Sequence, residues 1–279
     1  MQKLRKLNSF KVSTFFLLTI IFIKINNYAL CFDLKGNFIQ GGLLVGKLSV
    51  GDALYYNGKK IPIDETGEFI IGIGRKHPNF GNIKIVTTEK KEILKNIEIK
   101  QRKYNIQKIN NLKKSKVTPP AEFYDRIKLE NRRIKKAKAT NVEYSHYHAG
   151  FIMPAEGILT GVYGSQRILN GIPKRPHYGI DIANKIGSPI LAPSDGIVVM
   201  VEKDLYFSGG TIIISHGRGL TSSLLHLKKI LVEPGSFIKK GELIGLMGDT
   251  GRATGSHLDW RMELRGVRID PYLLIKKKE

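Results

Sequence analysis

The sequence predicts a mostly β protein, with a small N-terminal β-sandwich, a basic, partly helical linker and a C-terminal antiparallel β domain. Three observations support this fold class. Residues 36–100 alternate apolar and polar positions in short stretches separated by turn residues. From Met153 onward Gly recurs every few residues, and short apolar runs such as GIVVMV at 196–201 are typical of strands. A helical period appears between these regions, from Ala121 on.

Residues 1–31 are predicted to be a signal peptide. Basic residues such as Lys3 and Arg5 precede an apolar run at 15–23, which is shorter than the roughly 20 residues of a membrane span. Ala29-Leu30-Cys31 fits a signal-peptidase site, and cleavage after Cys31 is the favoured interpretation. Lipid attachment at Cys31 and an uncleaved N-terminal anchor stay open as alternatives. We therefore expect an exported protein of the periplasm or cell envelope, with membrane association left open.

Residues 32–100 are predicted to form the small β-sandwich-like domain. Asn57-Gly58 lies between alternating apolar residues, a strong signal for a two-residue hairpin turn, and Thr66-Gly67 begins another turn. This region contains no pattern typical of catalysis, so its expected role is that of a spacer or a docking module.

Residues 101–150 are predicted to be a basic linker that contains a helix. Large apolar residues are few, and Thr118-Pro119-Pro120 interrupts the chain. From Ala121, apolar residues follow a helical spacing with a basic opposite face. This face could contact a membrane or an envelope protein, although a solvated face is the more common explanation.

The charge of the chain is strongly positive, with 46 Lys and Arg against 24 Asp and Glu and a net charge of +22. Nucleic acid, an anionic membrane and an anionic cell-wall polymer would all be attracted to such a protein. A codon bias that favours Lys is an equally weighted alternative. Export and the lack of a recognisable nucleic-acid module argue against a nucleic-acid binder.

The residues that suggest chemistry lie in residues 151–279. RPHYGIDIAN places His177 and Asp181 four apart, which is about 13 Å along a straight strand. Both side chains could therefore touch one ion only if the chain bends, and Gly179 permits a bend. SSLLHLKK holds His226, and GSHLDW holds His257 and Asp259 on one side of a strand.

These segments, in this order, resemble the lysostaphin-like (LytM-type) zinc endopeptidases of bacterial cell walls. The resemblance covers residues 157–274 and includes HYGID, ILAPSDGIV, SHGRGL, LLHL, VEPGSFIKKGELIGLMGDTGRATGSHL and VRIDPYLL. It implies an antiparallel β domain with an open groove that holds one zinc ion. It also implies an exported metalloendopeptidase that cleaves peptide bonds of peptidoglycan, which would be its partner.

The resemblance also implies roles for individual residues. His177 and Asp181 would be zinc ligands, and His226 with His257 would be the catalytic pair that polarises water and stabilises the oxyanion. The third ligand of the family is normally a histidine, but that position is occupied here by Asp259. Because carboxylate oxygen is an accepted zinc ligand, Asp259 is expected to complete the metal site.

The replacement of a histidine by Asp259 changes the expected charge of the site. Two carboxylates and one neutral imidazole cancel the charge of Zn²⁺, so the centre should polarise water less or prefer a harder metal such as Mn²⁺. The alternative is that Asp259 binds nothing. The domain would then be a weak or inactive relative that binds the cell wall or regulates a cell-wall amidase.

Arg167, at the end of TGVYGSQR, is the predicted substrate-binding residue. Its guanidinium could bind a carboxylate of a stem peptide through two parallel hydrogen bonds. Support of its own loop is an equally weighted interpretation.

Overall fold

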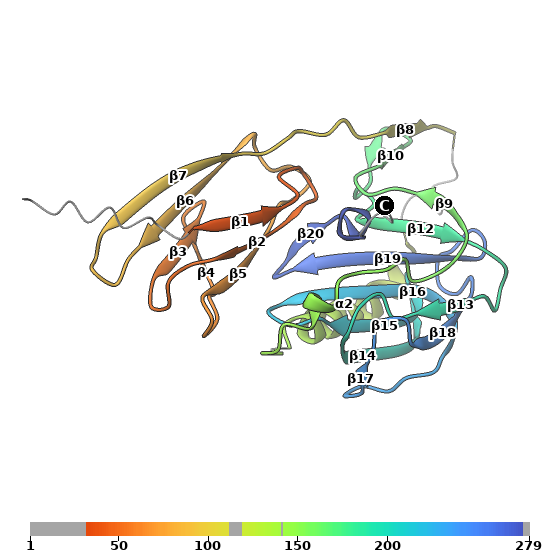
Figure 1. Cartoon of the computed structure of the whole chain (residues 1–279). Helices are drawn as coiled ribbons and strands as arrows, with labels where there is room; N and C mark the ends of the chain where they lie inside the picture. The colour runs from red at the N-terminus through yellow and green to blue at the C-terminus, as the bar shows by residue number, and fades with distance from the viewer. Residues whose placement is uncertain (1–31, 112–118, 141, 276–279) are drawn as a thin grey trace, which may run out of the picture. The chain divides into compact units, whose positions relative to one another are not determined.

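The computed structural model describes residues 32–111, 119–140 and 142–275. Within these ranges the chain is mostly β with antiparallel sheets and one α-helix, which confirms the predicted fold class (Figure 1). No helix in the described ranges is long and apolar enough to cross a membrane. The signal-peptide prediction for residues 1–31 lies outside the described residues.

The N-terminal region folds into two antiparallel sheets, with strand orders β1-β2-β5 and β4-β3-β6-β7 among the described strands. Asn57 and Gly58 have φ of 47° and 76° in the turn between β3 and β4, as the hairpin prediction requires. Side chains of both sheets are fully buried, including Leu44, Leu54 and Ile71. The strands are β1 (Asp33–Gly36), β2 (Leu43–Lys47), β3 (Ala53–Tyr56), β4 (Lys59–Ile61), β5 (Glu68–Gly72), β6 (Phe80–Val86) and β7 (Glu92–Glu98).

The C-terminal region is built on one large sheet whose main path runs β17-β14-β15-β16-β19-β12-β9 in the described chain (Figure 1). Strands β13 and β18 pair with each other beside β16, and β20 pairs with β19. The strands of this sheet are β9 (Ile158–Gly161), β12 (Gly179–Ala183), β13 (Pro189–Leu191), β14 (Gly196–Leu205), β15 (Gly209–Ser215), β16 (Leu220–Ile230), β17 (Phe237–Ile238), β18 (Leu243–Met247), β19 (His257–Leu264) and β20 (Val267–Ile269). Strands β10 (Gln166–Leu169) and β11 (Ile172–Pro173) form a separate small sheet with β8 (Ile106–Ile109).

Strand β19 separates the core of this sheet from its polar face. Successive side chains of a strand point to opposite faces. One face of β19 places four apolar side chains in the core, all at most 2% exposed: Leu258, Trp260, Met262 and Leu264. The other face carries polar residues in register, namely His257, Asp259, Arg261 and Glu263. The alternation of HLDWRMEL therefore sets which residues reach the candidate site.

The segment that the sequence predicts as a linker contributes structure to the C-terminal region. Strand β8 (Ile106–Ile109) pairs in parallel with β10. The helix α2 (Tyr124–Lys138) packs Ile134 and Ala137 against an apolar cluster on β14 and β15. Its last residue, Lys138, pairs with Glu263 of β19 at 3.0 Å. The remaining helical turns are η1 (Ala121–Phe123), η2 (His146–Ala149) and η3 (Pro271–Leu274).

A buried chain of hydrogen bonds links Asp195 and His216, which lie outside the strands, to strands β16 and β19. His216 is fully buried, with Nδ1 2.7 Å from the Asp195 carbonyl and Nε2 2.7 Å from Ser222 Oγ. The carbonyl can only accept, so Nδ1 carries the hydrogen and Nε2 accepts from the Ser222 hydroxyl. Ser222 in turn accepts from Trp260 Nε1 at 3.1 Å. Burial lowers the pKa of His216 to about 4, so the ring is neutral in the folded protein at neutral pH.

The neutral His216 makes the stability depend on pH. The unfolded chain binds a proton near pH 6.5, whereas the folded chain binds it only near pH 4, so stability is lost as the pH falls through this window. We expect His216 to account for a loss of about 3 kcal/mol between pH 7 and pH 4. Urea unfolding of the metal-free protein and of His216→Gln, which does not titrate there, measures the difference. Equal pH slopes for the two proteins would contradict this account.

Candidate metal site

Two neighbouring strands, β12 and β19, bring Asp181, Asp259 and His257 to one face of the large sheet. Asp181 on β12 lies directly opposite Asp259 on β19, and Asp259 also faces Leu225 on β16, next to His226. Directly opposed residues of adjacent strands point to the same face. Asp181 and Asp259 are therefore side by side, and like charges in such a pair repel unless cations compensate them.

His177 reaches the same face because the chain bends before β12 begins at Gly179, as the sequence analysis requires. Its Nε2 atom lies 3.3 Å from Asp181 Oδ1. Gly161, across from Asp181 on β9, leaves room for that carboxylate, since a Cβ there would lie 2.1 Å from Asp181 Oδ2. Because of this bend, the side chains of His177 and Asp181 are in contact although they are four residues apart in sequence.

The donor set formed by His177, Asp181 and Asp259 fits a metal ion. One ligand atom from each residue lies within 4.8 Å of the other two. His177 Nε2 and Asp181 Oδ1 are both buried without a hydrogen-bond partner in the described structure. Buried polar atoms are otherwise almost always paired, so this arrangement leaves two lone-pair donors that a cation would satisfy. One nitrogen and two carboxylate oxygens lie within the ligand set of zinc.

The two remaining predicted histidines lie beside this donor set, with their ring centroids 4.7 Å apart. His226 Nδ1 is 2.7 Å from the Thr250 carbonyl, and His257 Nδ1 is 2.8 Å from the Gly255 carbonyl. Carbonyl oxygens only accept, so both rings carry the hydrogen on Nδ1 and leave Nε2 able to accept a proton.

The backbone of His226 is held in an unusual conformation. Its φ is 68°, a left-handed value that a non-glycine residue rarely adopts, and its N–H donates to the Ser208 carbonyl at 2.9 Å. Burial lowers the pKa of His226, with the Thr250 carbonyl opposing this effect. The surrounding backbone therefore fixes both the position and the tautomer of this ring.

Arg261 is a site residue that the sequence analysis missed. Its Nε atom lies 3.0 Å from both carboxylate oxygens of Asp259, and its Nη2 atom lies 2.5 Å from Oδ2. Burial alone would raise the pKa of Asp259, but the Arg261 charge and hydrogen bonds outweigh it and lower the pKa. The period of two along β19 was the available signal, because it places Arg261 on the same face as Asp259.

Gly179 provides the space for this pair. It lies opposite Arg261 in the sheet, and a Cβ at Gly179 would lie 2.7 Å from Arg261 Cγ and 2.9 Å from Asp259 Oδ1. Any larger residue would displace the arginine from the carboxylate. Gly179 thus allows the bend after His177 and also accommodates the ion pair.

A cleft of about 850 Å³ begins at His177 and Asp181. Arg167 on β10 lines it, and Asn105 and Gln107 of the predicted linker form part of its wall. The cleft is rich in cations, with Arg167, Lys174, Arg175, Arg261 and Arg268 all among its lining residues.

Comparison with known proteins identifies the domain that carries this site. Residues 175–271 match the model of peptidase family M23. These residues form an M23 peptidase domain. The match contains all five residues of the histidine pair and the donor set, whereas Arg167 lies before it.

Relatives and solved structures agree with this assignment. The peptidoglycan DD-endopeptidases ShyA and ShyB of Vibrio cholerae are 43% and 34% identical to 37% and 53% of this chain. The matched regions span 24% of ShyA and 32% of ShyB, so less than half of either relative is represented. A solved M23-type structure from Pseudomonas aeruginosa superposes with a TM-score of 0.64 at 25% identity, covering 85% of this chain and 94% of that one. The M23 domain therefore belongs to a family of metallopeptidases with peptidoglycan hydrolases among its members.

The pairing of Asp259 with Arg261 predicts unequal costs for removing either partner in the metal-free protein. Asp259 is 3% exposed, so Arg261→Met leaves a buried, unpaired carboxylate and should cost about 3 kcal/mol at neutral pH. The Arg261 side chain is 35% exposed, so water would screen its unpaired charge in Asp259→Ala. That variant should therefore lose only about 1 kcal/mol of the free energy of unfolding. Urea unfolding of both variants and of the double variant measures these costs. Strictly additive losses would show that the two residues do not interact.

Proposed function

We propose that the M23 domain is a zinc metalloendopeptidase that hydrolyses peptide bonds of peptidoglycan. The observation that carries the proposal is the buried pair His177 Nε2 and Asp181 Oδ1, which lie 3.3 Å apart and have no hydrogen-bond partner among the described residues, beside two histidines whose Nδ1 atoms each bond a carbonyl. Three protein ligands and an adjacent proton acceptor are the parts that a hydrolytic zinc site requires. The M23 match and the names of ShyA and ShyB support the reaction class and the substrate.

In this proposal His177, Asp181 and Asp259 hold one zinc ion. Zinc in such a site acts as a Lewis acid and lowers the pKa of a water molecule toward about 7. The Nε2 atom of His226 or His257 then accepts the proton of the attacking water, because each Nδ1 is committed to a carbonyl. Once protonated, the same ring donates a hydrogen bond to the developing oxyanion or a proton to the leaving amine.

Arg261 changes the charge expected for the site. Two carboxylates and a neutral imidazole would cancel a divalent ion, but the Arg261 guanidinium on Asp259 restores one positive charge to the assembly. The three contacts with Arg261 leave each carboxylate oxygen with lone-pair capacity for a metal ion. In the proposed site, Asp259 with Arg261 thus takes the place of one neutral ligand.

A direct test incubates the full chain, loaded with one equivalent of zinc, with cross-linked peptidoglycan and measures new amino groups. We expect hydrolysis by the parent protein and a fall of about 10²–10⁴-fold in turnover for His226→Ala and His257→Ala. Zinc content should be unchanged in these variants, since neither histidine is a proposed ligand. His77→Ala, a histidine of the N-terminal sheets bonded to Tyr56, serves as the control with parental activity.

A stoichiometric metal without any released amine would refute the enzymatic proposal. It would favour the alternative of an inactive relative that binds the cell wall or regulates an amidase. In favour of that alternative, one relative is named as a lipoprotein and not as a peptidase. The chain is 33% identical over 129 residues to an NlpD/LppB lipoprotein homolog of Pseudomonas aeruginosa, with 41% of that protein covered.

Arg167 is proposed to bind a carboxylate of the peptide substrate within the cleft. Its side chain is exposed, lines the cleft and forms none of the ion pairs found among the described residues. A peptide in the groove would therefore meet an available guanidinium a short way from the metal site.

Arg167→Gln is expected to raise KM about tenfold for peptides with a free carboxylate, and to change it little for the same peptides amidated. Steady-state kinetics on such a matched pair of peptides measures the effect. The control variant is Lys185→Gln, which removes one exposed positive charge outside the lining of the cleft. An equal rise in KM for both peptides would show that Arg167 only supports its loop.

We also propose that the protein acts in the periplasm or cell envelope, as an exported protein. The peptidoglycan hydrolases among its relatives support this location. Contact with a membrane or an envelope protein through the basic linker stays a prediction. Helix α2 turns part of its basic surface to the sheet, where Arg126 pairs with Asp204 at 3.0 Å and Arg133 pairs with Glu202.

A further inference from the structure

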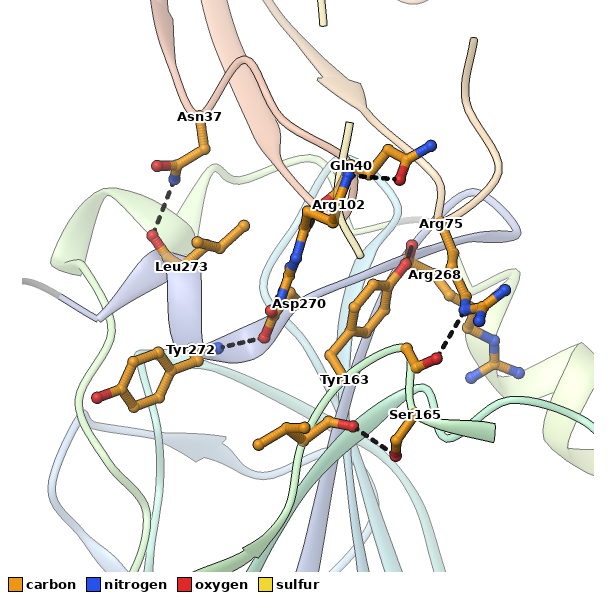
Figure 2. A network of polar contacts seen from close by, with 12 residues as sticks. Asn37, Gln40, Arg75, Arg102, Tyr163, Ser165, Arg268, Asp270, Tyr272 and Leu273 are labelled. Carbon is orange, nitrogen blue, oxygen red and sulfur yellow. Dashed lines mark hydrogen bonds and ion pairs between the residues drawn. The ribbon is translucent and has the colours of Figure 1, made fainter. Parts of the chain in front are cut away.

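We infer that the N-terminal sheets position the metal ligand His177, with Arg75 as the positioning residue. This inference rests on the proposed metal site, because it concerns the placement of one of its ligands. The residues that carry it are the turn at residues 163–165 and the side chains that reach this turn from the N-terminal region (Figure 2).

His177 lies outside β12, so the hydrogen bonds of the large sheet do not hold its backbone. Its backbone is held instead by the turn at 163–165. The Gly164 N–H donates to the His177 carbonyl at 2.8 Å, and the His177 N–H donates to the Ser165 carbonyl at 2.8 Å. The position of His177 therefore follows the position of this turn.

A residue of the N-terminal region holds this turn. Arg75 follows β5 and donates from Nε to the Gly164 carbonyl at 2.8 Å. The Arg75 guanidinium also stacks 4.3 Å from the centre of the Tyr104 ring. Tyr104 lies so close to Gly164 that a Cβ there would be 2.0 Å from the ring, and Gly164 has a φ of 86°. Gly164 is thus clamped between a hydrogen bond and an aromatic ring.

A second anchor fixes the segment that carries Tyr104. Arg102 Nη1 lies 2.7 Å from Asp270 Oδ2, on a carboxylate that is 4% exposed. The Arg102 N–H donates to Gln40 Oε1 at 3.1 Å, which ties the same residue to the N-terminal sheets (Figure 2). Tyr163, at the start of the turn, donates from its hydroxyl to the Arg268 carbonyl at 2.8 Å. The turn is consequently fixed from both regions of the chain.

The path from Arg75 to the metal site is short. The Arg75 side chain bonds the Gly164 carbonyl, and the Gly164 N–H bonds the His177 carbonyl. His177 carries the proposed ligand atom, Nε2, on its side chain. Residues that hold a ligand in place typically change metal affinity by about 10–100-fold when they are removed. Since Arg75 acts through the backbone of a turn, we expect the lower end of that range.

The experiment measures zinc affinity of the full chain by competition with a chromophoric chelator, for the parent and for Arg75→Met. Methionine keeps an unbranched apolar stem but removes both the hydrogen bond to Gly164 and the cation over Tyr104. We expect zinc to bind about tenfold more weakly. Arg75→Lys, which keeps the charge and a donor, should recover most of the affinity.

The matched control is Asn37→Ala. Asn37 also belongs to the N-terminal region, and its Nδ2 donates to the Leu273 carbonyl at 2.8 Å, a contact that does not involve the turn at 163–165. Asn37→Ala should leave zinc affinity within about twofold of the parent, because the hydrogen bond that it removes does not hold the turn at 163–165. Circular dichroism at the temperature of the assay checks that each variant is folded.

Two outcomes would overturn the inference. Parental affinity in folded Arg75→Met would show that Arg75 does not position His177. Equal weakening in Asn37→Ala would show a general effect of contact between the two regions. If Arg75→Met does not fold, Arg75→Gln, which also removes the charge and shortens the side chain, takes its place, and its parental affinity would overturn the inference in the same way. Failure of the parent to bind zinc would instead refute the proposed metal site itself, so the two failures are distinguishable.

Discussion

The site depends on the close placement of two carboxylates on neighbouring strands. Asp181 and Asp259 lie directly opposite each other in the pairing of β12 with β19, and Asp259 is almost fully buried. Two negative charges in that arrangement repel and are poorly solvated, so the fold must supply positive charge. Arg261 supplies one charge from the same strand, and the proposed metal ion supplies the rest.

The surrounding structure meets this constraint in two ways. Glycines leave space for the charged side chains, and the alternation of β19 places those side chains on one face. Gly179 and Gly161 leave room for the arginine and for the Asp181 carboxylate. The strict alternation of β19 keeps Trp260 in the core while Asp259 and Arg261 share the other face. One short strand therefore supplies the proposed catalytic histidine, a proposed ligand, the cation that balances it and four side chains of the core.

Much of the fold and the donor set followed from the sequence, for physical reasons. Period-two alternation and the Asn57-Gly58 turn are local signals, and they predicted β structure that the model confirms. The bend at Gly179 was predicted because a straight strand would hold His177 and Asp181 too far apart. The roles of the five site residues came from the resemblance to a family, and they stay proposals.

Other features depend on contacts between distant parts of the chain, which one sequence does not display. The expected loss of charge at the metal centre ignored Arg261, although the alternation that placed Asp259 places Arg261 beside it. The pairing of β8 with β10 and the contact of Arg75 with Gly164 join segments far apart in sequence. The region expected to be a linker therefore contributes to the cleft, and the region expected to be a spacer contacts the turn at 163–165.

The most direct test of this account is anomalous diffraction at the zinc edge from crystals of the full chain grown with zinc. We predict one peak within about 2.0–2.2 Å of His177 Nε2 and of an oxygen of both Asp181 and Asp259. Arg261 should remain on the far side of the Asp259 carboxylate. A peak that excludes Asp259, or an Arg261 displaced from it by the metal, would contradict the central claim that the two residues act together as one ligand.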